Sequence, residues 1–159
     1  MHTIVMDMTN AGAVEKGFAG LRSLDHELIS QAPQRGIGME FGILFTSHPD
    51  QSREPYPHRD VHARVTAEVQ AADALGYDTA WVAEHHFSNQ YGIMPDVFTY
   101  MGYLAAKTSH IRLGTAVVTV PLYEPVRVVE NMAFVDILSS GRVMIGLGSG
   151  YRPYEFAGF

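Results

Sequence analysis

The stretch IRLGTAVVTV at residues 111–120 decides how the rest of this 159-residue chain is interpreted. Its nearly continuous Val, Ile and Thr content is typical of a strand buried on both faces, as in a parallel sheet. Pro121 follows directly and ends the strand, because proline has no N–H to donate to a neighbouring strand. Parallel strands are joined by crossovers that are usually helical, so we expect a helix on each side of this strand.

Helical patterns do flank this strand in both directions. Before it, Asp96 is placed to cap a helix that runs to about Lys107, with Phe98, Met101, Leu104 and Ala105 as its apolar side. After it, a helix is predicted from near Pro125 to Leu138, and the sequence SSGR then turns the chain into a strand at Val143–Leu147.

The same alternation extends toward the N-terminus. A short apolar run at Thr79–Ala83 predicts a strand, and Met39–Thr46 predicts an earlier one, followed by a loop that contains Pro49, Pro55 and Pro57. Between them lies a helix that Gly76 is placed to end as a left-handed cap. Its apolar face is expected to consist of Val61, Val65, Val69, Ala72 and Leu75.

Four strands and three helices in the order βαβαβαβ fit two α/β architectures, an open doubly wound sheet or the first half of a TIM-type (β/α)8 barrel. The chain stops at AGF, after a Gly-rich loop and before any fourth helix, which leaves the last strand uncovered and prone to aggregate. We therefore expect a truncated barrel at residues 39–159. Residues 1–38 are expected to form an N-terminal extension, with one possible amphipathic helix through Val14, Phe18, Leu21, Leu28 and Ile29.

Composition excludes several classes of function. A net charge of -6 with scattered basic residues lacks the positive surface that nucleic-acid binding needs. No cysteine is present, which excludes disulfides and a thiolate nucleophile and fits a reducing cytoplasm. No apolar run approaches the roughly 20 residues of a membrane span, and the first residues do not form a signal peptide. We expect a cytoplasmic protein that does not enter membranes.

The densest polar cluster, Glu84-His85-His86, follows the strand at Thr79–Ala83. Active sites of parallel α/β folds lie at the carboxyl ends of strands, so its position favours a catalytic role. Side chains alternate along a strand, so one of the two histidines is expected to face the substrate. A neutral imidazole with a pKa near 6.5 can act as a general base. The alternative is two histidines that only hydrogen-bond neighbouring loops.

A metal site is a rival hypothesis, because His58 and His62 have the i, i+4 spacing of helical metal ligands. The residues between them do not complete an HExxH motif, and no third ligand is fixed by spacing. We expect no metal.

Two small-residue stretches allow a ligand to approach the backbone. GLGSG at residues 146–150 fits either a phosphate contact or a tight turn, and Tyr151 stands where a dinucleotide fingerprint needs its third glycine. GTAV at residues 114–117 fits either close packing or a planar ligand against the strand.

Four stretches in this order resemble the luciferase-like flavin-dependent monooxygenases. They are WVAEHHF (residues 81–87), IRLGTAVVTVPLYEPVRVVEN (111–131), VDILSSGRVMIGLGSG (135–150) and YRPYEFAGF (151–159). The resemblance implies a barrel that forms a homodimer or heterodimer, takes reduced FMN from a flavin reductase, and uses O2 to oxidise a small organic substrate. By position, His85 matches the family's catalytic base, and His86 and Glu84 match its active-site neighbours.

The resemblance also assigns cofactor contacts. Ala116 and Val117 match a pair joined by a non-prolyl cis peptide against the flavin ring, and Thr115 precedes them on the same strand. Glu130 and Arg127 match a polar pair near the cofactor.

The chain departs from the luciferase subunit at Gly148 and Ser149, which stand in place of a cysteine and a phosphate-contacting arginine. Light emission is therefore not implied. Two alternatives stay open: an oxidoreductase of the same barrel family that uses the deazaflavin F420, and a non-catalytic flavin-binding or structural half-barrel that assembles with a partner chain.

Overall fold

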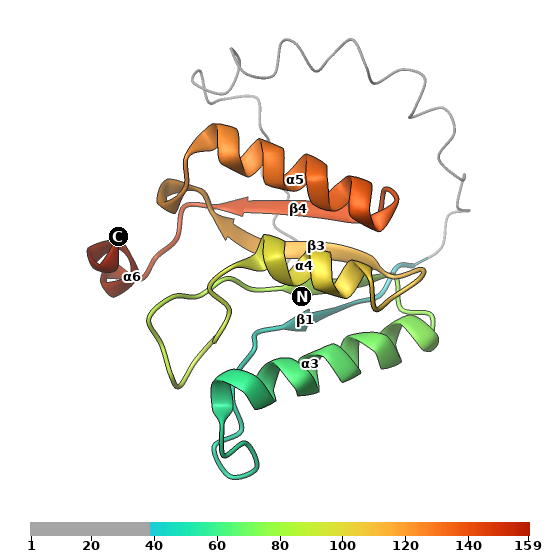
Figure 1. The fold of residues 1–159 in the computed structure, drawn as a ribbon, viewed down its shortest axis with the longest axis horizontal. Helices are drawn as coiled ribbons and strands as arrows, with labels where there is room; N and C mark the ends of the chain where they lie inside the picture. The colour runs from blue at the N-terminus through green and yellow to red at the C-terminus, as the bar shows by residue number, and fades with distance from the viewer. Residues whose placement is uncertain (1–38) are drawn as a thin grey trace. The chain divides into compact units, whose positions relative to one another are not determined.

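Four parallel strands form the centre of the computed structural model, which describes residues 39–159. The elements are β1 (Gly42–Phe45), α3 (Pro57–Ala74), β2 (Thr79–Val82), α4 (Val97–Ala105), β3 (Arg112–Thr119), the 3-10 turn η2 (Val120–Leu122), α5 (Pro125–Ser139), β4 (Val143–Gly148) and α6 (Pro153–Gly158). The strands lie in the order β1-β2-β3-β4 (Figure 1). Contacts divide the chain into Met1–Met39 and Glu40–Phe159, and the expected helix through Val14, Phe18, Leu21, Leu28 and Ile29 lies outside the described residues.

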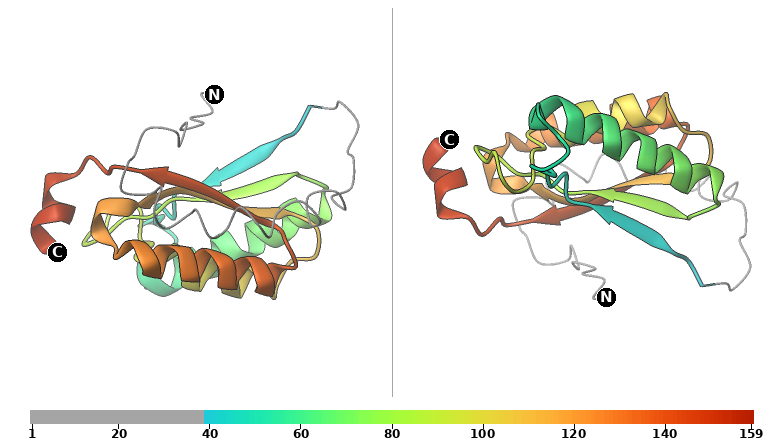
Figure 2. Two further views of the ribbon diagram at one scale, coloured as in Figure 1. Left: turned by 90° about the horizontal axis from the view of Figure 1, so that it is seen from above. Right: turned by 90° about the horizontal axis from the view of Figure 1, so that it is seen from below.

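Helices α3, α4 and α5 all cover the same face of the sheet (Figure 2). A doubly wound fold places helices on both faces, whereas a barrel places them all on its outside. The arrangement is therefore that of a half (β/α)8 barrel, as predicted.

The core lies between the sheet and these helices. In α3, Val61, Val65, Val69 and Ala72 are buried as predicted, and so are Phe98, Met101, Leu104 and Ala105 of α4. The prediction was wrong for Leu75, which is 77% exposed because the helix ends at Ala74 and Leu75 is its C-cap. No helix within residues 39–159 has the length and apolar character to cross a membrane.

The predicted helix ends agree closely with the structure. The Asp96 carboxylate caps α4 by accepting the N–H of Thr99 at 3.0 Å. Gly76 follows α3 with a φ of 81°, the left-handed conformation expected of a cap. Helix α4 ends at Ala105, two residues before the predicted Lys107.

Two strand predictions and one helix prediction need correction. Strand β1 covers only Gly42–Phe45 of the predicted Met39–Thr46, and Ser47, with a φ of 51°, turns the chain away after it. Strand β4 runs to Gly148, so part of the predicted Gly-rich loop is extended strand. A fourth helical segment, α6, does exist after β4, and Pro153 favours its start by fixing φ at the first helical position.

Candidate functional site

The carboxyl ends of all four strands lie at the same end of the sheet (Figure 1). The segment after β2 and helix α6 meet there, although they are far apart in the sequence. Two hydrogen bonds to the carboxylate of Glu155 in α6, from His85 and from the backbone of His86, join them. The predicted Glu84-His85-His86 cluster lies within this junction.

Glu84 is an internal anchor rather than an open ligand. Its side chain is fully buried, and its Oε1 lies 2.6 Å from Nε2 of His86. Its Oε2 accepts the backbone N–H of Thr119 at the end of β3, and the phenol of Tyr123 is a further partner. Burial raises the pKa of the Glu84 carboxyl, and these hydrogen bonds oppose that rise. Glu84 therefore holds the ends of β2 and β3 together and orients His86.

The His85 ring has a different side-chain partner from the Glu84–His86 pair, in a segment that lies beyond the end of β2 at Val82. Its Nδ1 lies 3.2 Å from Oε1 of Glu155, and its side chain is 12% exposed. Tyr91 packs against the ring with a centroid distance of 5.3 Å. Gly92 is needed here, because a Cβ at that position would lie 2.2 Å from the ring.

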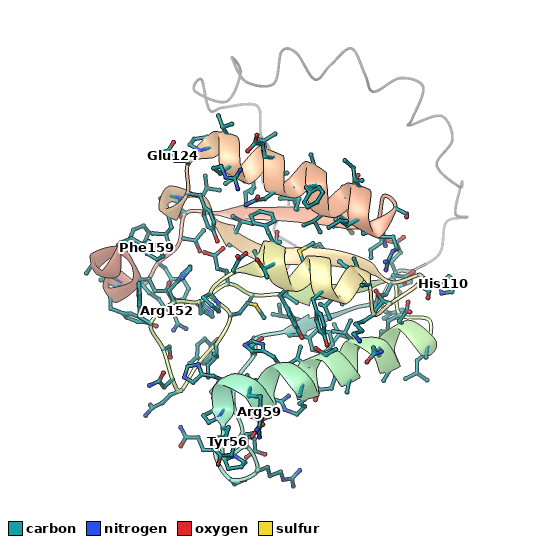
Figure 3. All side chains as sticks on the ribbon, in the orientation of Figure 1. Tyr56, Arg59, His110, Glu124, Arg152 and Phe159 are labelled. Carbon is teal, nitrogen blue, oxygen red and sulfur yellow. The ribbon has the colours of Figure 1, made fainter. Side chains whose placement is uncertain are left out.

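The surroundings of His85 favour its neutral form by lowering the imidazole pKa. Burial lowers its pKa most, and the positive charge of Arg152 lowers it further, while Glu155 acts in the opposite direction. Arg152 lies at this carboxyl end, close to Phe159 in the view of Figure 3. Nε2 of His85 has no hydrogen-bond partner within residues 39–159, so this nitrogen is free to accept a proton.

Glu155 is the residue of this junction that sequence reasoning missed. It is 3% exposed, and its Oε1 also accepts the backbone N–H of His86 at 3.0 Å. The only sequence signal is an acidic residue in a short segment that begins with Pro153, which does not indicate burial. Its role comes from a contact 70 residues away in the sequence.

Strand β3 is joined to this junction at its carboxyl end, where the Thr119 N–H donates to Glu84, and β4 pairs with β3. The peptide bond between Ala116 and Val117 is cis, as the family resemblance implies, and the strand pairing shifts register there. Ala116, Val117 and Gly148 are half-exposed. Gly146 is required for packing, because a Cβ there would lie 2.3 Å from the backbone oxygen of Thr115.

Thr115 is fully buried, and its hydroxyl bonds both the N–H and the carbonyl of Gly146 at 2.9 Å. Its side chain therefore supports the sheet. Ser149 is exposed, and its hydroxyl contacts only the neighbouring Gly150 carbonyl among the described residues.

The structure does not bring Arg127 and Glu130 into the junction. They pair with each other at 2.7 Å on the exposed surface of α5, with side chains 66% and 58% exposed. Arg127 lines a groove between α4 and α5, on the helical side of the sheet.

The histidines considered as metal ligands have other surroundings. His58 lies 3.1 Å from Asn89, and residues 39–159 contain no group of three His, Cys, Asp or Glu side chains arranged to hold a metal. Nδ1 of His62 is buried without a hydrogen-bond partner in this part of the chain, next to the ring of Tyr100. Burial first, and the charge of His58 second, lower the His62 pKa.

A depressed histidine pKa makes the fold sensitive to acid. The unfolded chain then binds more protons than the native state, so stability is present above the ordinary imidazole pKa of about 6.5 and is lost as the pH falls toward the native pKa. We expect His62→Phe, which keeps an aromatic ring beside Tyr100, to reduce the loss of unfolding free energy between about pH 7.5 and pH 5. Urea denaturation at both pH values measures this loss. His110→Phe, at an exposed histidine, is the control. An unchanged pH dependence in His62→Phe would show that His62 is not responsible.

Comparison with known proteins identifies the family of this chain. The family model described as luciferase-like monooxygenase matches residues 39–159. The oxygenase component of a flavin-dependent trigonelline monooxygenase from Acinetobacter baylyi is 32% identical over 74% of this chain and 32% of its own length. The alkanal monooxygenase alpha chain of the Kryptophanaron alfredi symbiont is 33% identical over 76% of this chain and 33% of its own length.

A solved structure agrees with these matches. The monooxygenase RslO1 from Streptomyces bottropensis superimposes with a TM-score of 0.68 at 28% identity, over 76% of this chain and 36% of that protein. The chain thus spans about a third of the length of each of these relatives.

Proposed function

Because this chain belongs to the luciferase-like monooxygenase family, we propose that it provides part of the active site of an FMN-dependent monooxygenase that acts on a small organic substrate. The observation that carries the proposal is the partly buried His85 imidazole, with its lowered pKa, at the same carboxyl end of the sheet as the partly exposed residues of β3 and β4. A flavin supplies the redox chemistry, whereas the protein supplies a binding surface, orientation and groups such as a base.

The residues at this end of the sheet fit a flavin. Ala116 has a small side chain, and the Val117 side chain packs on Gly148, where a Cβ would lie 2.4 Å from it, so the proposed flavin ring would contact this apolar patch. Arg152, half-exposed nearby, supplies a positive charge. Thr115 supports this surface from within the sheet, and Ser149 is exposed at its edge.

The chemistry divides between the cofactor and the protein. Reduced FMN, when bound, supplies two electrons to O2, so that one oxygen atom enters the substrate and the other leaves as water. His85 accepts a proton at Nε2 during this oxidation and returns it to solvent through the exposed part of its ring. Glu84 and His86 hold the carboxyl ends of β2 and β3 in register, which fixes the distance between the base and the β3 surface. The partly buried position of His85 limits the access of water.

Anaerobic titration of the full-length protein with reduced FMN and with reduced F420 tests this proposal. We expect saturable binding of reduced FMN and much weaker binding of F420. Selective binding of F420 would instead establish a hydride-transferring oxidoreductase of the same family. Binding of neither cofactor would reject the flavin site and favour a structural half-barrel. The oxygenase component among the relatives supports a separate flavin reductase as the source of reduced FMN.

We also propose that two copies associate through α4 and α5. Phe134, Ile137 and Leu138 of α5 are 62%, 73% and 51% exposed, and Phe134 and Leu138 line the groove of about 350 Å³ between the two helices. A contiguous apolar surface of this kind marks an interaction site.

The cytoplasmic location that we propose is consistent with the absence of cysteine.

Light scattering on Ile137→Glu tests the association surface. A glutamate carboxylate at position 137 would be buried in the interface without an ion-pair or hydrogen-bond partner. We therefore expect the dimer to dissociate into monomers that remain folded by circular dichroism. Arg53→Glu, on an exposed loop, is the control and should leave the mass unchanged. A persistent Ile137→Glu dimer would place the interface elsewhere.

A further inference from the structure

We propose that Glu155 is a positioning residue that keeps the proton of neutral His85 on Nδ1, so that Nε2 is the nitrogen that accepts a proton. This inference rests on the proposed role of His85 as the base. It assigns a purpose to the contact between α6 and the segment after β2, which the family resemblance did not indicate.

The hydrogen bonds around Glu155 determine the direction of proton donation. Its Oε1 accepts the backbone N–H of His86 at 3.0 Å and lies 3.2 Å from Nδ1 of His85. A carboxylate oxygen only accepts, so the imidazole nitrogen that faces it must carry the hydrogen. In a neutral ring the other nitrogen, Nε2, then has a free lone pair.

The other groups that face His85 favour the neutral ring without selecting a nitrogen. Arg152 contributes positive charge, and its guanidinium is itself held over the Tyr91 ring at 4.4 Å and bonded to the hydroxyl of Tyr154 at 2.6 Å. Tyr91 packs against the ring at a centroid distance of 5.3 Å, and the His86 ring is bonded to Glu84 instead of to His85. Within residues 39–159, Glu155 is the only hydrogen-bond partner of the His85 ring.

Burial strengthens the preference of the His85 ring for carrying its proton on Nδ1. Glu155 is 3% exposed and the His85 side chain 12% exposed, so water competes weakly for either group. The positions of Tyr91 and Gly92 against the ring restrict its rotation. The ring therefore cannot easily turn over to present Nε2 to the carboxylate.

A purely structural role for Glu155 would lead to a different expectation for the His85 tautomer. If Glu155 only anchors the His86 backbone, the tautomer of His85 should not depend on it. Long-range ¹H–¹⁵N correlation NMR of the full chain distinguishes a protonated imidazole nitrogen from an unprotonated one. The His85 signals are identified by their loss in His85→Gln, and spectra are recorded at a pH where the ring is neutral.

We expect wild-type His85 to carry its proton on Nδ1 in most molecules. In Glu155→Leu we expect most His85 rings to carry the proton on Nε2 instead. Glu155→Gln keeps an acceptor oxygen without the charge, so we expect it to lose only part of the Nδ1–H form. Glu130→Leu, at an exposed glutamate, should leave the tautomer unchanged. A wild-type ring protonated on Nε2 would overturn the proposal even if the variants fail to fold. A folded Glu155→Leu that retains the Nδ1–H form would overturn it as well.

The tautomer measurement needs no flavin, so its outcome is separate from that of the proposed function. An Nδ1–H tautomer that depends on Glu155, in a protein that binds no reduced FMN, would reject the monooxygenase and leave the positioning role intact. A protein that binds reduced FMN but carries the His85 proton on Nε2 would reject the positioning role of Glu155 and leave the proposed flavin site intact.

Discussion

His85→Ala in the full-length protein is expected to lower the rate of substrate oxygenation by about 10²-fold or more while leaving the affinity for reduced FMN nearly unchanged. The reason is that His85 supplies the proton acceptor, whereas the backbone of β3 and β4 supplies the proposed cofactor surface. Single-turnover oxygenation with the natural substrate, combined with an anaerobic FMN titration, separates the two effects.

His110→Ala is the matched control for this variant. His110 is exposed and lies at the opposite end of the molecule from Arg152 (Figure 3). Its removal should change neither the rate nor the affinity. If His85→Ala oxygenates at the wild-type rate, the base is another group, and His86 is the next to test. A large loss of FMN affinity would instead make His85 a cofactor ligand.

The second large effect expected is on stability. Glu84→Ala should lower the free energy of unfolding by about 3 kcal/mol, because two buried donors and one partly buried donor lose their acceptor at about 1–3 kcal/mol each. These donors are the His86 imidazole, the Thr119 backbone N–H and the Tyr123 hydroxyl. Urea denaturation followed by circular dichroism measures the change without any cofactor present.

Glu130→Ala removes a carboxylate of the same kind from an exposed surface pair and should change stability by no more than about 0.5 kcal/mol. Equal effects of the two substitutions would mean that Glu84 does not join β2 to β3. In that case the carboxylate would be available to a ligand, as the sequence resemblance implied.

The fold could be predicted because its determinants are local. Residues close together in the sequence are enough to predict these elements. Examples are the apolar spacing of α3, the Asp96 cap of α4 and the Val-rich run of β3. The choice between a barrel and a doubly wound sheet could not be derived from these patterns, because it depends on which face each helix covers. The short helix α6 was missed for the related reason that six residues carry no helical periodicity.

The site could be predicted only in part, because its contacts are distant in sequence. The Glu84-His85-His86 cluster was recognisable from its position after a strand, and its two histidine rings have different partners, although β2 ends at Val82 and which of them faces the substrate stays a prediction. The buried environment that lowers the His85 pKa is formed by residues from Tyr91 to Glu155, which no spacing rule connects. Arg127 and Glu130 were matched by position alone; they pair with each other on the exposed surface of α5, and their place near the cofactor stays a prediction.

Hydrogen–deuterium exchange of the full-length protein, with and without reduced FMN under anaerobic conditions, tests most directly whether the carboxyl ends of β2, β3 and β4 form a flavin site. The result expected is slower exchange at residues 84–87, 115–119 and 146–156, with little change in α3. Unchanged exchange at these three segments in the presence of saturating reduced FMN, or slowing confined to the groove between α4 and α5, would contradict it.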